Sequence, residues 1–259
     1  MRLVSLLAAA QSLIYQGQPL RIPFQCGEDD IHALGLDCTA EAPCAVFLEL
    51  TGLEIAGAKI FASGNLHTAT TTLASILLAS EDEGKTWTEP HERIRSAGLE
   101  QIQFVDFERG WVAGQQLQAV PRDPFFLVTT DGGKSWRRRP VAGEGQVGAI
   151  EQFWFDSRTD GLVAIDRMQS AETGARHSIY ESRTGGEGWS IREVSARPLK
   201  LKRAAGQNPD RRLRADARSK SFVLERRTGG RWQILASFLV ETGVCRPPPE
   251  PEPAPPQGQ

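Results

Sequence analysis

No stretch of the 259-residue chain approaches the ~18 consecutive apolar residues that a membrane-spanning helix needs. Cysteine is scarce, and the four cysteines lack the CxxC pairs of a zinc site. No GxSxG motif and no Cys/His pairing pattern is present, and the histidines are scattered without metal-ligand spacing (His32, His67, His91 and His177). We therefore expect a soluble mature chain with no metal, no cofactor and no catalytic residue.

One glycine-rich motif, GEGQVG at 143–148, matches the GxGxxG pattern of dinucleotide-binding turns. In such a site the motif opens a helix, whose N-terminus receives the pyrophosphate. Here it precedes AIEQFWFD, which is typical of a strand. We interpret the motif as a link between strands, so it predicts no nucleotide cofactor.

The net charge of −2 hides a basic block in the last quarter of the chain. From Arg197 to Arg231 there are 12 Lys and Arg against three acidic residues, a local net charge of +9. The rest of the chain therefore has a net charge of −11. A basic stripe suits an anionic partner, but edge strands also carry Lys and Arg to prevent edge-to-edge pairing, and both interpretations stay open. No helix-turn-helix pattern accompanies the block, so we expect no nucleic-acid partner. The candidate partner face comprises Arg203, Arg211, Arg212, Arg214 and Arg218.

The N-terminus and the cysteines both favour export. MRLVSLLAAAQSL has one Arg, a short apolar run and small residues at Ala8 and Ala10 that fit a signal-peptidase site, so we expect a leader at 1–18. Four cysteines are an even number, compatible with two disulfides in an exported protein, and three connectivities are open. One of them combines a tight local loop with a tie between the two ends of the domain (Cys38–Cys44 and Cys26–Cys245). We expect a periplasmic or secreted protein.

Tryptophans recur at a regular spacing: Trp87, Trp136, Trp189 and Trp232 lie 49, 53 and 43 residues apart. Each closes a Gly-rich corner after the same run of strand signals, which in the second unit are GLEQIQFVDF, GWVAGQQLQAV, FFLVTTDGG and SWRRRPV. Four strands per repeat of about fifty residues are the signature of a β-propeller blade. We predict an all-β propeller of about four four-stranded blades, with LRIPFQ as a candidate additional strand. The first strand of each unit is expected near the centre, at Phe47, Phe104, Phe153 and Leu201.

The predicted domain spans 19–246, and its fourth unit is expected to begin with the strand PLKLKR. Outside the blades, EDDIHALG at 28–35 predicts one helical turn. The proline-rich tail at 247–259 cannot bury a core and is expected to be disordered. The repeats are placed at about 43–92, 98–142, 147–195 and 197–240.

The corners SEDEGKTW (80–87) and TTDGGKSW (129–136) raise the question whether their aspartates do chemistry or hold a turn. A carboxylate in a tight corner accepts hydrogen bonds from turn N–H groups, glycine supplies positive φ, and the tryptophan is expected to pack flat against the neighbouring blade. The third and fourth units carry threonine at the aspartate position, and threonine is no general acid or base near pH 7. We therefore interpret the corner residues as structural. They are Ser80, Asp82, Gly84, Thr86, Trp87, Thr129, Asp131, Gly133, Ser135 and Trp136, with a degenerate set of Thr184, Gly186, Trp189, Thr228, Gly230 and Trp232.

The S/T-x-D-x-G-x-T/S-W pattern of these corners resembles the Asp-box, or bacterial neuraminidase repeat, of sialidase-like propellers. The wording FVDFERGWVAG followed by LVTTDGGKSW is most similar to that of photosystem II stability and assembly factor-like proteins. This second resemblance covers residues 43–240 approximately and fades in the fourth unit. It implies a non-catalytic, exported propeller that acts as a binding or assembly scaffold. From the basic block we expect a protein or an anionic envelope polymer as its partner. We expect a monomer.

The resemblance also brings an alternative function, an exo-sialidase or another glycoside hydrolase. LRIPF at 20–24 resembles the Arg-Ile-Pro motif of sialidases, which implies Arg21 as the first of three carboxylate-binding arginines. The sialidase pattern also needs a tyrosine nucleophile late in the chain. The only tyrosines are Tyr15, in the leader region, and Tyr180, in the strand that enters the third corner. Because this catalytic set finds no match, the non-catalytic function is preferred.

Overall fold

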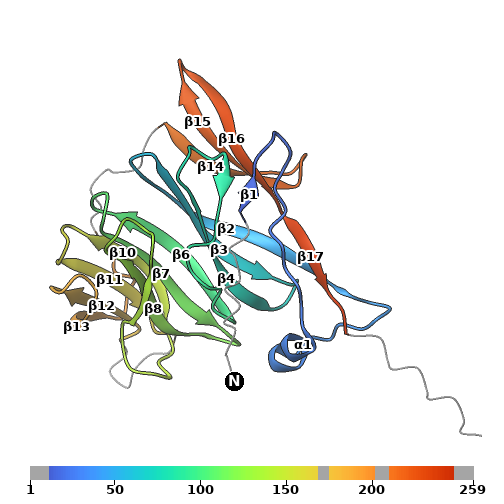
Figure 1. Cartoon of the computed structure of the whole chain (residues 1–259). Coiled ribbons are helices and arrows are strands. Elements are labelled where there is room, and N and C mark those ends of the chain that lie inside the picture. Colours follow the sequence, from blue (N-terminus) through green and yellow to red (C-terminus); the bar gives the residue numbers. More distant parts are fainter. Residues whose placement is uncertain (1–11, 169–174, 202–209, 248–259) are drawn as a thin grey trace, which may run out of the picture.

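The computed structural model describes residues 12–168, 175–201 and 210–247, and these are almost entirely β-structure. The helix α1 (Glu28–Leu34) is the helical turn predicted in EDDIHALG. It ends at Gly35, whose left-handed backbone (φ 60°) is the usual termination of a helix. The rest of the described chain forms strands that pair as antiparallel sheets (Figure 1).

The first blade is an antiparallel sheet that also recruits the two ends of the chain. Its core strands are β2 (Cys44–Ala56), β3 (Lys59–His67) and β4 (Thr72–Ser80). The short strand β5 (Thr86–Trp87) follows on its outer side, where Ala79 bridges to Thr88. The chain ends add β17 (Glu241–Cys245) on the free edge of β2 and β1 (Leu13–Ile14) on β5.

The second and third blades are complete four-stranded meanders. The second consists of β6 (Ala97–Phe104), β7 (Gly110–Leu117), β8 (Pro121–Thr129) and β9 (Arg137–Pro140). The third consists of β10 (Ala149–Phe155), β11 (Gly161–Asp166), β12 (His177–Ser182) and β13 (Ser190–Ser195). The fourth has three strands, β14 (Arg211–Asp216), β15 (Ser221–Thr228) and β16 (Arg231–Leu239).

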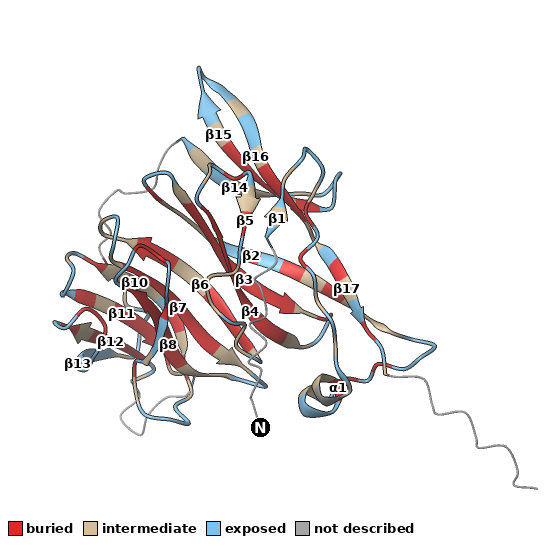
Figure 2. Ribbon diagram, in the orientation of Figure 1, coloured by how far each residue is buried: buried red, intermediate tan, exposed pale blue. Residues whose placement is uncertain are grey.

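The middle strands of the first blade are buried on both faces, because that blade packs between the fourth blade and the second. β4 reads TLASILLAS, and all but its first residue are buried. Such a near-continuous apolar run is what a strand covered on both faces requires. The outer strand β13 is exposed along nearly its whole length, and Figure 2 shows this change from buried centre to exposed rim.

Three apolar clusters hold the blades together and define their order in space. One joins the fourth blade to the first, through Phe238 and Leu48 among others. The second joins the first blade to the second, and the third joins the second to the third. No such cluster of described residues joins the third blade to the fourth. The blades therefore follow one another as fourth, first, second and third, and form the arc seen in Figure 1.

The chain ends are fastened at the junction of the fourth and first blades. Leu20 exchanges two backbone hydrogen bonds with β16, at Ser237 and Leu239 (both 2.8 Å). Two disulfides, Cys26–Cys245 and Cys38–Cys44, tie this segment to β17 and to the start of β2. Of the three open connectivities, the structure thus contains the one that links the domain ends.

The predicted all-β propeller with about four blades is confirmed, but its fourth blade differs from the prediction. PLKLKR was expected to be the first strand of that blade. Residues 198–201 form no strand, and the rest of the motif lies outside the described residues. LRIPFQ contributes only the bridge of Leu20 to Phe238. Most of the leader (1–11) and the tail from 248 onwards also lie outside the described residues.

Candidate functional site

The first corner is closed by a network centred on Asp82. Its carboxylate accepts hydrogen bonds from the N–H and the hydroxyl of Thr86 (2.8 and 2.7 Å) and from the hydroxyl of Ser80 (2.9 Å). The Ser80 hydroxyl in turn accepts the N–H of Gly84 (2.8 Å), and Trp87 Nε1 donates to the Gly84 carbonyl (2.9 Å). Gly84 has φ +92°, a backbone conformation that glycine adopts without strain.

The second corner repeats this network residue for residue. Asp131 accepts hydrogen bonds from the N–H and hydroxyl of Ser135 (3.0 and 2.5 Å) and from the hydroxyl of Thr129 (2.8 Å). Gly133 N donates to Thr129 Oγ1 (2.9 Å), and Trp136 Nε1 donates to the Gly133 carbonyl (3.1 Å). Two sequence-distant corners with one hydrogen-bond pattern indicate a repeated structural element.

Both corner carboxylates are held in the ionised state. Desolvation is the largest single influence and raises the pKa of Asp131, but the hydrogen bonds from Ser135 and Thr129 together outweigh it and lower this pKa to about 2. The pKa of Asp82 is lowered by the matching hydrogen bonds, again against desolvation. A carboxylate whose lone pairs are taken by its own turn has little capacity left for general acid or base catalysis.

The third and fourth corners use simpler turns. In the third, Thr184 Oγ1 accepts the Gly188 N–H (3.0 Å), and Ser182 Oγ accepts the Gly186 N–H (2.9 Å). The fourth is a two-residue hairpin between Thr228 and Arg231. Its two glycines, Gly229 and Gly230, have φ +58° and +78°, as a tight turn between twisted strands requires.

The corner tryptophans contact the preceding blade, but two of them do so edge-on. Trp136 meets Phe61 of the first blade at 80°, with ring centroids 6.0 Å apart, so the flat packing predicted for it is wrong. Trp87 is likewise edge-on to an aromatic ring of the fourth blade. Trp189 does stack on Phe126 of the second blade, at 19° and 5.1 Å. Trp232 instead packs within its own blade, under the Arg212 guanidinium at 4.1 Å.

The residues that a sialidase would need lie apart from one another. The exposed Arg21 donates to the carbonyl of Glu241, beside β17. Tyr180 is buried in the cluster between the second and third blades, where its hydroxyl accepts a hydrogen bond from Arg167 (3.0 Å). Tyr15 packs against the cluster of the first and fourth blades. In the described part of the chain these residues do not assemble into one site.

A groove of about 410 Å³ lies between the inner strand of the first blade, β2, and β14 of the fourth. Its walls combine apolar and arginine side chains, an arrangement suited to a segment that carries both apolar and acidic residues. We call this the β2/β14 groove. It is lined by Leu50, Thr51, Leu53, Glu54, Ile55, Arg211, Arg212, Leu213, Arg214, Ala215 and Phe222.

Three predicted partner-face arginines line this groove, and two of them are already engaged by acidic groups. Arg212 Nε donates to the buried carboxylate of Glu225 (2.6 Å). Arg214 donates to the same carboxylate (3.2 Å) and to Asp216 (3.0 Å). These arginines lower the pKa of Glu225 even though desolvation, the largest influence, raises it. Among the described residues the terminal Nη groups of Arg212 have no hydrogen-bond partner, and the side chain is 44% exposed.

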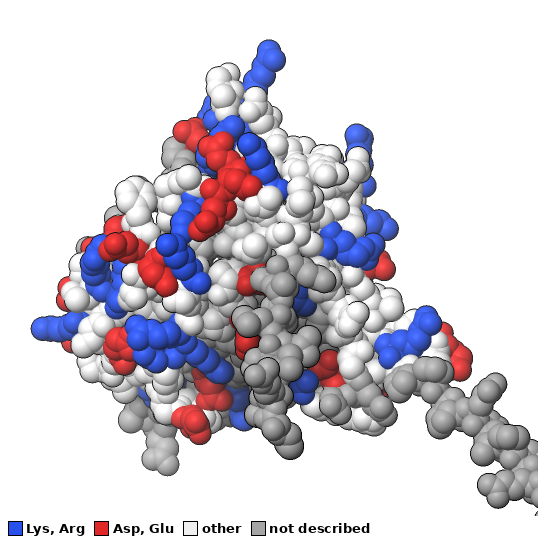
Figure 3. Space-filling view, in the orientation of Figure 1, with Lys and Arg blue, Asp and Glu red and all other residues white. Residues whose placement is uncertain are grey.

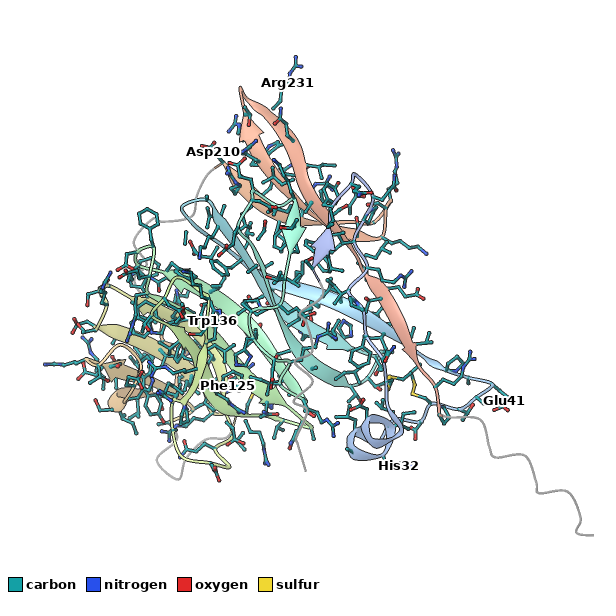
Figure 4. All side chains as sticks on the ribbon, in the orientation of Figure 1. His32, Glu41, Phe125, Trp136, Asp210 and Arg231 are labelled. Carbon is teal, nitrogen blue, oxygen red and sulfur yellow. A yellow bond between two sulfur atoms is a disulfide. The ribbon has the colours of Figure 1, made fainter. Side chains whose placement is uncertain are left out.

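The other predicted arginines have different positions. Arg211 also lines the groove, but from the face of β14 that carries Leu213, and its Nε is buried without a hydrogen-bond partner in the described chain. Arg218 is exposed in the turn after β14, and Arg203 lies outside the described residues. Figure 4 shows that the fourth blade also projects a hairpin whose tip carries Arg231. On the face shown in Figure 3, basic and acidic side chains are interspersed rather than gathered into one basic field.

Glu54, which lies in the wall of the β2/β14 groove, was not predicted from the sequence. Burial raises its pKa to about 7, against a smaller lowering by the Ile55 N–H. The residue follows a leucine in a strand that alternates irregularly, so nothing in its pattern distinguished it from a solvated glutamate. Its burial becomes visible only once the fourth blade is placed beside the first.

Two further polar clusters were also missed by the sequence analysis. A hollow of about 320 Å³ between the first two blades brings together Glu49 and Glu100, and burial followed by the charge of Glu49 raises the pKa of Glu100. In the third blade, Glu151, Asp166 and His177 offer ligand atoms within 4.8 Å of one another. Both Asp166 oxygens are bound by Arg176 (2.7 and 2.5 Å), so a metal ion would have to displace that guanidinium.

The chain has similarities among solved structures, but none among family models or curated proteins. A scan against protein-family models and a search of curated proteins gave no match. Among solved structures, the chain is similar to "YCF48 bound to D1 peptide" (16% identity, TM-score 0.42, covering 74% of this chain and 55% of that one). It is also similar to "Phage phi92 endosialidase" (10% identity, TM-score 0.39, covering 81% of this chain and 44% of that one). A third similar structure is an α-L-arabinanase of Penicillium chrysogenum (11% identity, TM-score 0.36, covering 86% of this chain and 66% of that one).

The chain spans about half the length of the first two of these structures. At such TM-scores the likenesses carry no argument about activity or partner. No helix in the described part of the chain has the length and apolar character needed to cross a bilayer.

Proposed function

We propose that the protein is a non-catalytic binding propeller whose β2/β14 groove holds an acidic segment of a partner protein. The groove is the observation that carries this proposal, because it combines an apolar wall with arginine donors. Charge-assisted hydrogen bonds from the Arg212 Nη groups would fix a ligand carboxylate, while Leu50 and Leu53 would cover apolar side chains. The corner aspartates would support the scaffold and take no part in binding.

The test is a peptide array of acidic segments from exported proteins of the source organism, followed by fluorescence anisotropy with the tightest binder. The matched variants are Arg212→Gln/Arg214→Gln/Glu225→Gln and Arg231→Gln. Each lowers the net charge by one, and the first leaves no buried carboxylate unpaired. We expect the triple variant to weaken binding at least about tenfold and Arg231→Gln to leave it unchanged, with binding weaker at high salt. Absence of any binder, or equal binding by both variants, would contradict the proposal.

Export is proposed on the basis of the two disulfides, which persist mainly in oxidising compartments. Fractionation of cells that express the full chain, with thiol labelling before and after reduction, tests this. We expect the chain outside the cytoplasm with its four cysteines protected from labelling. Light scattering of the purified protein tests the expected monomer.

Glycoside hydrolysis is the second candidate, and Glu49 with Glu100 is the observation that favours it. A carboxyl with a raised pKa beside a second carboxylate is the usual acid and base pair of glycosidases. Fluorogenic sialosides and arabinosides provide the assay. Turnover that Glu100→Gln abolishes would establish an enzyme, whereas we expect no turnover above the uncatalysed rate.

A further inference from the structure

The corners identify which strand the fourth blade lacks. In the first three blades the corner joins the third strand to the fourth, as β4 to β5 and β8 to β9. In the fourth blade the corresponding hairpin joins β15 to β16. These are therefore its third and fourth strands, and β14 is its second. Among the described residues, no strand occupies the first, innermost position beside β14.

The start of the fourth unit is bound to the third blade instead. The Gln152 side chain accepts the Leu201 N–H (3.1 Å) and donates to the Leu201 carbonyl (3.5 Å). One blade earlier, the Gln101 side chain binds the backbone of β10 in a similar manner. It donates to the Glu151 carbonyl and accepts the Phe153 N–H (both 3.3 Å). Leu201 thus lies where the inner strand of a following blade would begin.

The inner edge of β14 faces the β2/β14 groove. Among the described residues β14 pairs with β15 alone, and an edge strand is a template for pairing with another segment. The molecule already uses this principle once, because β2 accepts the sequence-distant β17 on its own inner edge. The groove therefore offers main-chain hydrogen bonds in addition to its side-chain walls.

The two faces of β14 specify which side chains a paired segment should carry. Alternate residues of a strand share a face, so Leu213 and Ala215 point one way and Arg212 and Arg214 the other. Leu213 packs against the apolar cluster that joins the fourth blade to the first and includes Leu50. A strand added beside β14 would alternate in the same register, with apolar side chains toward the first blade and acidic ones toward the arginines.

We propose that the partner's segment binds to β14 by strand addition and completes the fourth blade as its missing inner strand. This inference rests on the proposed binding function and adds to it the binding mode and a recognition pattern. The pattern is an extended stretch of about six residues, as long as β14, in which apolar and acidic residues alternate. Main-chain hydrogen bonds provide affinity, and the two walls provide specificity.

The probe is a fluorescein-labelled, capped heptapeptide of alternating valine and glutamate, compared with the same peptide carrying lysine in place of glutamate. Two further versions carry N-methyl groups, one on the valines and one on the glutamates. Only one set of amides in an added strand faces β14. We expect one N-methylated peptide to bind about tenfold more weakly or worse and the other to bind like the parent. The lysine peptide should not bind.

Hydrogen exchange of the full-length protein supplies the second readout. We expect alternate amides of β14 to exchange readily in the free protein and to become protected when the glutamate peptide is bound. Protection already present in the free protein would overturn the proposal, because the chain itself would then fill the position.

The two proposals fail in different ways. If both N-methylated peptides bind like the parent and the β14 amides show no new protection, strand addition is wrong while groove binding stands. If neither this probe nor any acidic peptide of the array binds, the proposed function itself fails.

Discussion

The indole of Trp87 meets the ring of Phe238 edge-on, at 83° and with 5.0 Å between the ring centroids. Both side chains are fully buried, and they belong to the first corner and to the last blade. This contact closes the junction that also forms the β2/β14 groove. The shape of the groove therefore depends on a contact just behind its walls, because Phe238 pairs across the sheet with Phe222, which lines the groove.

Phe238→Ala should destabilise the protein by about 3–5 kcal/mol, because it leaves a cavity beside the buried indole. Chemical denaturation at pH 7 measures the loss. The matched control is Phe107→Ala, since Phe107 is 73% exposed and should cost little. An equal effect of the two substitutions would show that the fourth blade is not packed on the first in this way.

Asp131→Asn should cost about 1–3 kcal/mol at pH 7, because an amide cannot accept the hydrogen bonds that Ser135 and Thr129 donate to both oxygens. The pKa of Asp131 is lowered to about 2 in the folded state. The stability that its charge contributes is therefore fully present above the ordinary pKa of an aspartate and is lost as the pH falls toward 2. The difference between wild type and variant, measured by urea unfolding, should therefore shrink over that range. The control is Asp37→Asn at an exposed position; a pH-independent difference at Asp131 would contradict the role of its charge.

Glu54→Gln should stabilise the protein at pH 8 and leave it unchanged near pH 4.5. The pKa of Glu54 is raised to about 7 in the folded state, so the folded protein binds a proton that the unfolded chain has released. The stability that this group contributes falls as the pH rises from its ordinary pKa to about 7. At pH 8 the buried charge should cost about 1–3 kcal/mol, and the glutamine variant avoids this cost. Thermal unfolding at both pH values checks this against Glu144→Gln, an exposed control.

The two disulfides should contribute unequally. Cys26–Cys245 joins residues 219 apart, whereas Cys38–Cys44 joins residues 6 apart. Loop-closure entropy predicts about 5 kcal/mol for the longer connection and about 2 kcal/mol for the shorter one. Double serine variants of each pair, compared by denaturation under oxidising conditions, provide the measurement. A larger loss from the short loop would mean that the chain ends do not depend on their covalent tie.

Turn chemistry explains why the fold was predictable from the sequence. A tight corner needs glycine at positive φ and a side chain that accepts turn N–H groups, so Gly84 and Asp82 leave a local signature that recurs in Gly133 and Asp131. The spacing of the signatures then reveals the blades. The order of the blades in space left no such signature. The contact of Trp87 with Phe238, which joins the first blade to the fourth, is between residues that lie far apart in the sequence and have ordinary apolar neighbours.

The candidate site was predictable only in part, for a similar reason. Arg212 and Arg214 were identified by their alternation, but their neutralisation by Glu225 follows from the register of β14 on β15. That register pairs Arg212 with Glu225 across two strands, and no local pattern contains it. Glu54 and the apolar wall of the groove arise from the packing of one blade on another, which is a tertiary property.

Methyl NMR of leucine-labelled protein, titrated with the tightest acidic peptide, tests most directly whether the β2/β14 groove is the binding site. The proposal predicts that the resonances of Leu50, Leu53 and Leu213, which line the groove, shift in a saturable manner. Leu162, in the third blade, should not respond. Shifts confined to the third blade, or no saturable shift at the groove leucines while the peptide binds, would contradict the proposed function.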